Sequence, residues 1–264
     1  MTYSFSMVKM ESFLIVQGFL FWSFLAFSSG QEENHYLYIG SGVAHPSMVG
    51  LSGGNPAGLT YNARSKLLGD VGLSTLAGTK NPTYFGGGFF AGNGKIGGGV
   101  AMTETPANGG STSSNSINAG LGFELGSLNT SVGILCAIAS SSLSCSKLGL
   151  LYDSKRSFRL GGTVITGAYP VVTGGFAYDF NKNATFVTDV TENFSSKVTT
   201  IAPGIGFYFS NLQFMASYYI TKITGTATSS TTFFGFGLEL TKTFHLLAYS
   251  NLSSSHELQL VIAL

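Results

Sequence analysis

Four acidic residues are the strongest candidates for chemistry in this sequence: Glu124, Asp179, Asp189 and Glu239. Each lies in a stretch with the alternating pattern of a β-strand, in which successive side chains point to opposite faces. The acids fall on the face opposite the large apolar side chains, so we expect all four to point inward. Two interpretations remain open: the acids keep a wet lumen solvated, or they form a site for a cationic or polar ligand.

Motifs of enzymes and of metal or nucleotide sites are weak in this chain. The four histidines, His35, His45, His245 and His256, show no metal-ligand spacing and have no cysteine cluster beside them. The segment 92–97 fits a dinucleotide fingerprint by its letters, but it lies at a hairpin turn and opens no helix. A lipid hydrolase is the enzymatic alternative, and no segment isolates a nucleophile for it. We therefore predict a protein that is not an enzyme and has no catalytic, cofactor or metal site.

Three stretches repeat one strand pattern: Gly120-Leu-Gly-Phe-Glu-Leu125, Gly204-Ile-Gly-Phe-Tyr-Phe209 and Gly235-Phe-Gly-Leu-Glu-Leu240. As a strand, each presents Leu, Ile or Phe on one face and glycines followed by Glu or Tyr on the other. An apolar outer face with a small, polar inner face is typical of a transmembrane β-barrel. By the same alternation we assign to lipid the apolar residues of three further stretches: Leu212, Phe214, Ala216, Tyr218, Ile220; Phe176, Tyr178, Phe180; and Leu258, Leu260, Ile262, Leu264.

The composition supports a membrane barrel. Charged residues are 9% of the chain, against about 25% in an average soluble domain. After the N-terminus no run of about 18 apolar residues occurs, so helical spans are excluded and a closed barrel remains. The net charge of +1 gives no support for a nucleic-acid partner, and no basic run exists to neutralise a phosphate backbone, so we expect none.

The N-terminus has the layout of a secretory signal peptide. Lys9 precedes an apolar run over 13–27, and the small residues 28–30 follow it. The alternative is a retained membrane anchor, but Gln17 and Gly18 interrupt the run. We predict that residues 1–30 are removed and that the mature chain lies in the outer membrane of a Gram-negative bacterium.

Candidate strands with brief turns between them fill the rest of the chain. They lie near 58–64, 66–74, 83–91, 95–104, 116–125, 130–139, 146–153, 157–167, 171–180, 184–191, 198–209, 212–221, 232–241, 244–250 and 255–264. The predicted fold class is all-β, an antiparallel transmembrane barrel of about 14 strands (range 10–16) that occupies residues 55–264. Cys136 and Cys145 flank one hairpin turn. They either bridge it in an oxidising periplasm, or Cys136 is simply a small lipid-facing residue.

The segment Asn55-Pro56-Ala57-Gly58-Leu59 resembles the signature of the long-chain fatty acid transporter (FadL) family of outer-membrane barrels. In that family the motif joins an N-terminal plug to the first of fourteen strands, and hydrophobic substrates cross the barrel and leave sideways into the membrane. The resemblance implies that residues 31–54 form a short plug and that Asn55 and Pro56 are its hinge. In size and composition the chain is also similar to small porin-like, FadL-related proteins of predatory bacteria, whose barrels form rings that enclose lipid.

Two functions follow from this pattern and this resemblance. The first is porin-like transport, or transport of hydrophobic compounds, through a plugged lumen. The alternative is a non-conducting structural membrane protein that forms homo-oligomeric rings around lipid. The expected partners are membrane lipids, further copies of the chain and a hydrophobic small molecule.

Overall fold

The computed structural model describes residues 41–46, 54–61, 66–74, 82–105, 114–139, 142–154, 157–181, 183–225, 228–251 and 255–264. The predicted signal peptide over 1–30 lies outside these ranges, as does most of the predicted plug over 31–54.

Fourteen strands and two short 3₁₀ helices make up the described chain. In order they are η1 (Pro56–Tyr61), β1 (Lys66–Ser74), β2 (Pro82–Gly92), β3 (Ile96–Thr105), β4 (Ser114–Glu124), η3 (Gly126–Leu128), β5 (Thr130–Ala139), β6 (Ser142–Asp153), β7 (Phe158–Ile165), β8 (Val171–Asn181), β9 (Ala184–Asn193), β10 (Val198–Phe209), β11 (Leu212–Ile223), β12 (Ser229–Glu239), β13 (Phe244–Ser250) and β14 (Ser255–Ala263).

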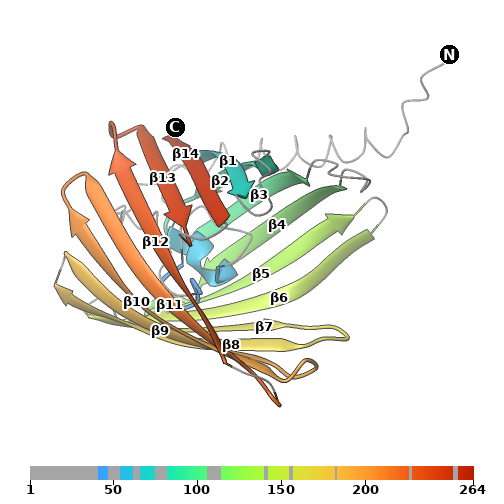
Figure 1. Ribbon diagram of the computed structural model, residues 1–264. Helices are drawn as coiled ribbons and strands as arrows, with labels where there is room; N and C mark the ends of the chain where they lie inside the picture. The colour runs from blue at the N-terminus through green and yellow to red at the C-terminus, as the bar shows by residue number, and fades with distance from the viewer. Residues whose placement is uncertain are drawn as a thin grey trace, which may run out of the picture.

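The strands close into one antiparallel barrel in which each strand pairs with its neighbours in sequence. The barrel is sealed by β1 and β14, which pair from Lys66 opposite Ala263 to Ser74 opposite Ser255. Figure 1 shows these two strands side by side, with the other strands completing the wall. Closure leaves no free sheet edge, which is the condition for a β-structure to cross a membrane. The predicted antiparallel barrel of about 14 strands is confirmed.

Burial alternates along the strands as the lipid-face prediction requires. On β11, Phe214 and Tyr218 are exposed, whereas Met215 and Ser217 between them are buried. The same alternation runs through β13, where His245, Leu247 and Tyr249 are buried. The outer wall is therefore apolar, and the barrel encloses its own packed interior. Among the described residues, no helix is long and apolar enough to cross a membrane.

The prediction of a strand near 58–64 is wrong, because residues 56–61 form the 3₁₀ helix η1. Pro56 has a fixed φ that suits the first position of a helix. The side-chain oxygen of Asn55 accepts a hydrogen bond from the Ala57 N–H at 3.0 Å, which is the geometry of a helix N-cap. The Asn-Pro pair therefore starts a helical turn before the first strand begins.

Candidate functional site

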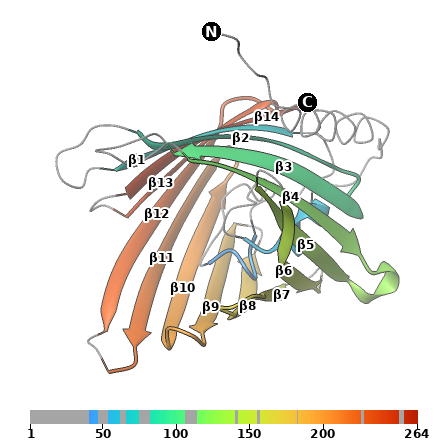
Figure 2. The same ribbon diagram turned by 90° about the vertical axis from the view of Figure 1, so that its right-hand side faces the viewer.

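Two described stretches, 41–46 and 54–61, lie inside the barrel, and we call them together the inner segment. In Figures 1 and 2 the inner segment appears in blue within the ring of strands. Its helical part, η1, packs against strands β2 to β6. Val43, Ala44, Ala57 and Leu59 are all at most 2% exposed. The inner segment is therefore part of the buried interior, and its helical part lies on one side of that interior.

Asn55 joins the two stretches of the inner segment to each other and to the wall. Its side-chain nitrogen donates to the carbonyl of Val43 at 3.1 Å and to the carbonyl of Leu150 in β6 at 2.7 Å. Its backbone N–H donates to the carbonyl of Gly42 at 3.1 Å. The side chain is 2% exposed. The structure therefore places Asn55 at a fixed junction, while the hinge motion predicted for Asn55 and Pro56 stays a prediction.

A row of glycines on the inner wall makes room for this contact. Gly97, Gly122, Gly133 and Gly149 lie directly opposite one another on β3, β4, β5 and β6. We call these four residues the glycine row. A Cβ atom on any of them would come within 3.0 Å of Asn55, Pro56, Ala57 or Leu59. The glycine row is thus the surface on which η1 lies.

Two more glycines extend the contact to the other stretch of the inner segment. A Cβ on Gly161 of β7 would meet the carbonyl of Val43. Gly175 lies opposite Gly161 on β8, and a Cβ there would meet the carboxylate of Asp189 and, at 3.1 Å, the Cβ of Ala44. Of the glycines that the sequence assigned to the inner face, Gly122 is required by close approach of the inner segment, whereas a Cβ on Gly235 would meet the side chain of Met215.

Asp189 binds the start of the inner segment. Its Oδ2 accepts hydrogen bonds from the backbone N–H and from the hydroxyl of Ser41, both at 2.8 Å. The residue is 0% exposed. A buried carboxylate is costly unless donors satisfy it, and here the donors come from the inner segment. These hydrogen bonds join β9 to residues 41–43, and we call this contact the latch.

Asp179 has a different partner within the wall. It forms an ion pair with Arg159 of β7 at 2.6 Å and accepts a hydrogen bond from the Thr185 hydroxyl of β9 at 2.6 Å. Arg159 is 3% exposed, whereas the Asp179 side chain is 28% exposed, so the ion pair is buried on the arginine side. Asp179 therefore fixes three neighbouring strands to one another.

The two glutamates lie on other strands. Glu124 ends β4, opposite Ser131, and Glu239 ends β12, opposite His245. The structure therefore brings the two aspartates to the adjacent strands β8 and β9 and leaves the glutamates at separate places around the barrel. Within the described ranges, no group of three or more His, Cys, Asp or Glu side chains could hold a metal ion.

Further polar contacts that the sequence did not indicate tie the inner segment to the wall. The Tyr61 hydroxyl donates to Asp153 of β6 at 3.0 Å. The Tyr208 hydroxyl of β10 is hydrogen-bonded to Nε2 of His45 across 2.8 Å. Arg159 could have been found from the sequence, because it shares the inward alternation of Gly161. His45 could not, because nothing in its local pattern points to β10.

The inner wall of β11, β13 and β14 combines apolar side chains with buried polar ones, among them Ser217, His245 and Gln259. Buried side chains of β11, β13 and β14 belong to the same packed cluster as Ala44 and Leu59 of the inner segment. They are Met215, Leu247, Tyr249 and Val261. A passage along this side of the interior would offer hydrocarbon surface to a solute instead of a ladder of charges.

Cys136 and Cys145 are joined by a disulfide across the β5–β6 hairpin. The two residues are opposite one another in the strand register, next to an irregularity between Leu135 and Cys136. Of the two possibilities that the sequence left open, the structure shows the bridge.

Comparison with known proteins identifies the fold. The CymD monoaromatic hydrocarbon channel superposes with a TM-score of 0.53, at 12% sequence identity, over 86% of this chain and 97% of that chain. This chain has the fold of an outer-membrane β-barrel. A mutant of the Rhodopseudomonas blastica porin is also similar, with a TM-score of 0.48 at 6% identity over 76% of this chain and 99% of that chain. No protein-family model and no curated protein matches the sequence.

Proposed function

We propose that this chain is a FadL-like outer-membrane barrel that transports small hydrophobic compounds. The observation that carries the proposal is the asymmetry of the interior. The inner segment is held by hydrogen bonds to β6 and β9, whereas the wall on the opposite side presents Met215, Leu247, Tyr249 and Val261. A solute that passes along this wall contacts these apolar side chains, with the buried Ser217, His245 and Gln259 between them.

Two further points support this function. The structure that superposes over 86% of this chain is named as a channel for monoaromatic hydrocarbons. The Asn55-Pro56-Ala57-Gly58-Leu59 motif, which resembles the FadL signature, is the part of the inner segment in contact with the glycine row. We assign residues 31–54 to the plug, with Asn55 and Pro56 as its joint to the wall.

In this function the inward acids have a structural role. Asp189 holds the plug through Ser41, and Asp179 holds Arg159 within the wall. Glu124 and Glu239, which are half-buried at strand ends, solvate the mouth of the barrel. None of them is assigned to a cationic ligand. The protein acts in the outer membrane of a Gram-negative bacterium, after removal of residues 1–30.

One observation favours the alternative function. The buried apolar cluster is continuous from Ala44 and Leu59 of the inner segment to Leu247 and Val261 of the opposite wall. Side chains that fill the centre in this way would close the barrel, so the protein would act through contacts of its outer wall. Such a protein would form homo-oligomeric rings around lipid and would pass nothing.

Uptake by bacterial cells that lack hydrocarbon channels of their own tests the proposal. Cells that express the full chain should take up radiolabelled oleate or a labelled monoaromatic hydrocarbon faster than cells carrying an empty vector. The variant Met215→Arg places a charge on the apolar inner wall and should lower this uptake, while Ser229→Arg at the exposed start of β12 should not. Uptake equal to that of empty-vector cells, from a barrel shown to be folded, would contradict transport and support the closed alternative.

A further inference from the structure

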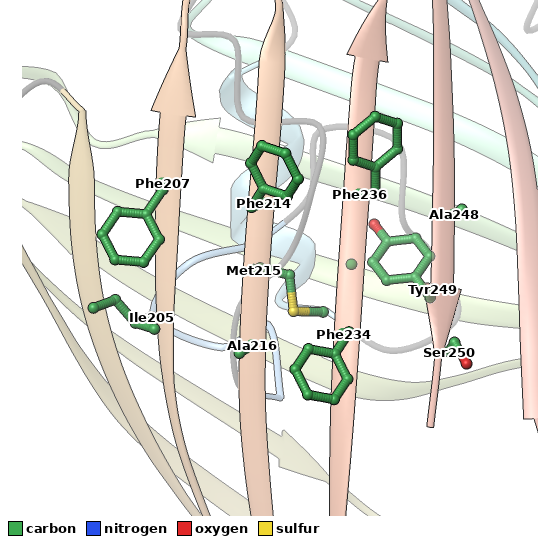
Figure 3. Close-up of a pocket in the computed structure, with 11 residues that line it drawn as sticks. Ile205, Phe207, Phe214, Met215, Ala216, Phe234, Phe236, Ala248, Tyr249 and Ser250 are labelled. Carbon is green, nitrogen blue, oxygen red and sulfur yellow. The ribbon is translucent and has the colours of Figure 1, made fainter. Parts of the chain in front are cut away.

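A hollow of about 380 Å³ lies in the outer wall of the barrel, across β10, β11, β12 and β13. Figure 3 shows its side chains from outside, with the inner segment behind the strands. Two rows of outward residues frame it. In the first row Ile205 lies opposite Ala216, and Ala216 lies opposite Phe234. We call this site the aromatic hollow.

The second row, one step along the strands, carries three phenylalanines. Phe207 lies opposite Phe214, Phe214 opposite Phe236, and Phe236 opposite Ala248. The rings of Phe214 and Phe236 meet edge to face, with centroids 5.3 Å apart. Ala216 and Ala248 are too short to fill the space between such rings. The hollow is therefore a direct result of two alanines placed among large side chains on the same face.

The lining of the hollow is almost wholly apolar. Among the described residues that line it, Tyr249 and Ser250 alone carry side-chain oxygens, and both are hydroxyls. A lipid headgroup or a sugar would find no charged side chain here and few hydrogen-bonding partners, so a ligand of this site has to be hydrocarbon. A volume of about 380 Å³ is within the range of small-molecule sites, about 300–1,000 Å³.

The surroundings indicate where that hydrocarbon comes from. Phe214 and Phe234 are each 42% exposed and belong to the apolar outer face, so the hollow is continuous with the surface that the bilayer covers. Within a bilayer, packing contacts decide association, because lipid tails are as apolar as the side chains. A lipid acyl chain in the hollow touches aromatic rings on several sides, whereas an acyl chain on a flat part of the wall touches the protein on one side only.

We propose that the aromatic hollow binds one hydrocarbon chain of a membrane lipid and holds that lipid on the barrel. The site opens on the outer wall, although Met215 and Tyr249 of the interior cluster also line it, and binding a lipid there goes beyond the transport function. It requires only that β10–β13 face the bilayer.

Retention of a brominated lipid tests the proposal. The sequence contains one tryptophan, Trp22, so the Trp22→Phe variant of the full chain has no indole. In this background Phe234→Trp places a reporter at the hollow. Phe123→Trp places a matched reporter at an exposed phenylalanine of β4, which is 41% exposed. Each protein is reconstituted in phosphatidylethanolamine vesicles with brominated acyl chains, extracted into mild detergent, washed, and measured by fluorescence.

We expect the Phe234→Trp reporter to stay quenched after washing and the Phe123→Trp reporter to recover its emission. Ala216→Phe, or Ala248→Phe from the neighbouring strand, should fill the hollow and abolish the retained quenching. Circular dichroism measures whether each of these two variants retains its β-structure, and quenching is compared only in a variant that does. Equal recovery at both reporters would overturn the proposal. Recovery together with a dimer that Ala216→Phe converts to a monomer would also overturn it, because a second copy of the chain would then cover the hollow.

Discussion

The side-chain oxygen of Asn55 lies so close to Gly149 that it leaves no room for a Cβ atom there. The same side chain donates to the carbonyl of Leu150, the next residue of β6. The asparagine therefore contacts the wall at a glycine and bonds to the backbone beside it. Both features are needed, because any side chain at position 149 would push the amide away from its acceptor.

This relationship predicts the effect of substituting Gly149. Gly149→Ala should lower the free energy of unfolding by about 1–3 kcal/mol, the usual cost of overpacking a tightly packed interior. The measurement is a urea titration of the protein folded in lipid vesicles. Gly174→Ala on β8 is the matched control, since a Cβ at Gly174 would meet nothing within 4 Å. Equal losses for the two variants would show that the inner segment does not lie against β6.

The latch at Asp189 predicts a local effect as well as a global one. Asp189→Ala removes the acceptor of two Ser41 hydrogen bonds and should cost about 1.5–3 kcal/mol, as expected for bonds to a charged group. Hydrogen exchange followed by mass spectrometry should show faster exchange in peptides that cover 41–46. Asp179→Ala serves as the control, because Asp179 contacts Arg159 and Thr185 of the wall. It should also lower stability, yet leave exchange in 41–46 unchanged; acceleration by both variants would argue against a specific latch.

The strands could be read from the sequence because alternation in a membrane barrel has a simple cause. Lipid outside and a small, crowded interior impose opposite requirements on successive residues, so the pattern marks each strand. The predicted stretch 130–139 coincides with β5, and 198–209 coincides with β10. The prediction of a strand over 58–64 was wrong because Leu59 and Tyr61 alternate as in a strand. The N-cap formed by Asn55 and Pro56 instead starts a 3₁₀ helix there.

The contacts within the site were less accessible to sequence reasoning. Glycines could be assigned to the inner face, but the partner of Gly161 is Val43, more than a hundred residues away, and no local pattern encodes it. The aromatic hollow likewise depends on the register of four strands, which places Ala216 beside Phe234. Alternation gives the face of a residue, whereas register gives its neighbours, and register follows from closure of the whole barrel.

The outer face predicts the cost of a charge in the lipid. Phe214→Arg should destabilise the folded protein by about 2–4 kcal/mol in vesicles, because the guanidinium would face hydrocarbon. Ser229→Arg, at the exposed start of β12 and with the inward alternation of Gly235, should cost less, because its guanidinium does not face hydrocarbon. Refolding titrations of the two variants provide the comparison. A large cost at both positions, or at neither, would be inconsistent with a lipid-facing β11.

The hairpin disulfide predicts a dependence on redox conditions. Reducing the Cys136–Cys145 bridge should lower the free energy of unfolding by about 2–3 kcal/mol, since the bridge closes a short loop in the unfolded chain. The double variant Cys136→Ser and Cys145→Ser should show this loss without reductant and should not respond to added reductant. Urea titrations of both proteins with and without reductant give the four values needed. A reductant effect on the double variant would mean that the bridge is not its source.

Deletion of residues 31–54 separates the two functions. The deletion removes Ser41 and His45, and with them the hydrogen bonds to Asp189 and Tyr208. If these contacts hold a plug in a transport barrel, planar bilayers containing the deleted protein should show larger or less gated currents than bilayers containing the full chain. If side chains of the wall fill the lumen, currents should be negligible for both proteins, because the interior stays closed without residues 31–54. Large currents from the intact protein would overturn the closed barrel. Negligible currents from both proteins, together with stable oligomers that retain lipid, would overturn transport.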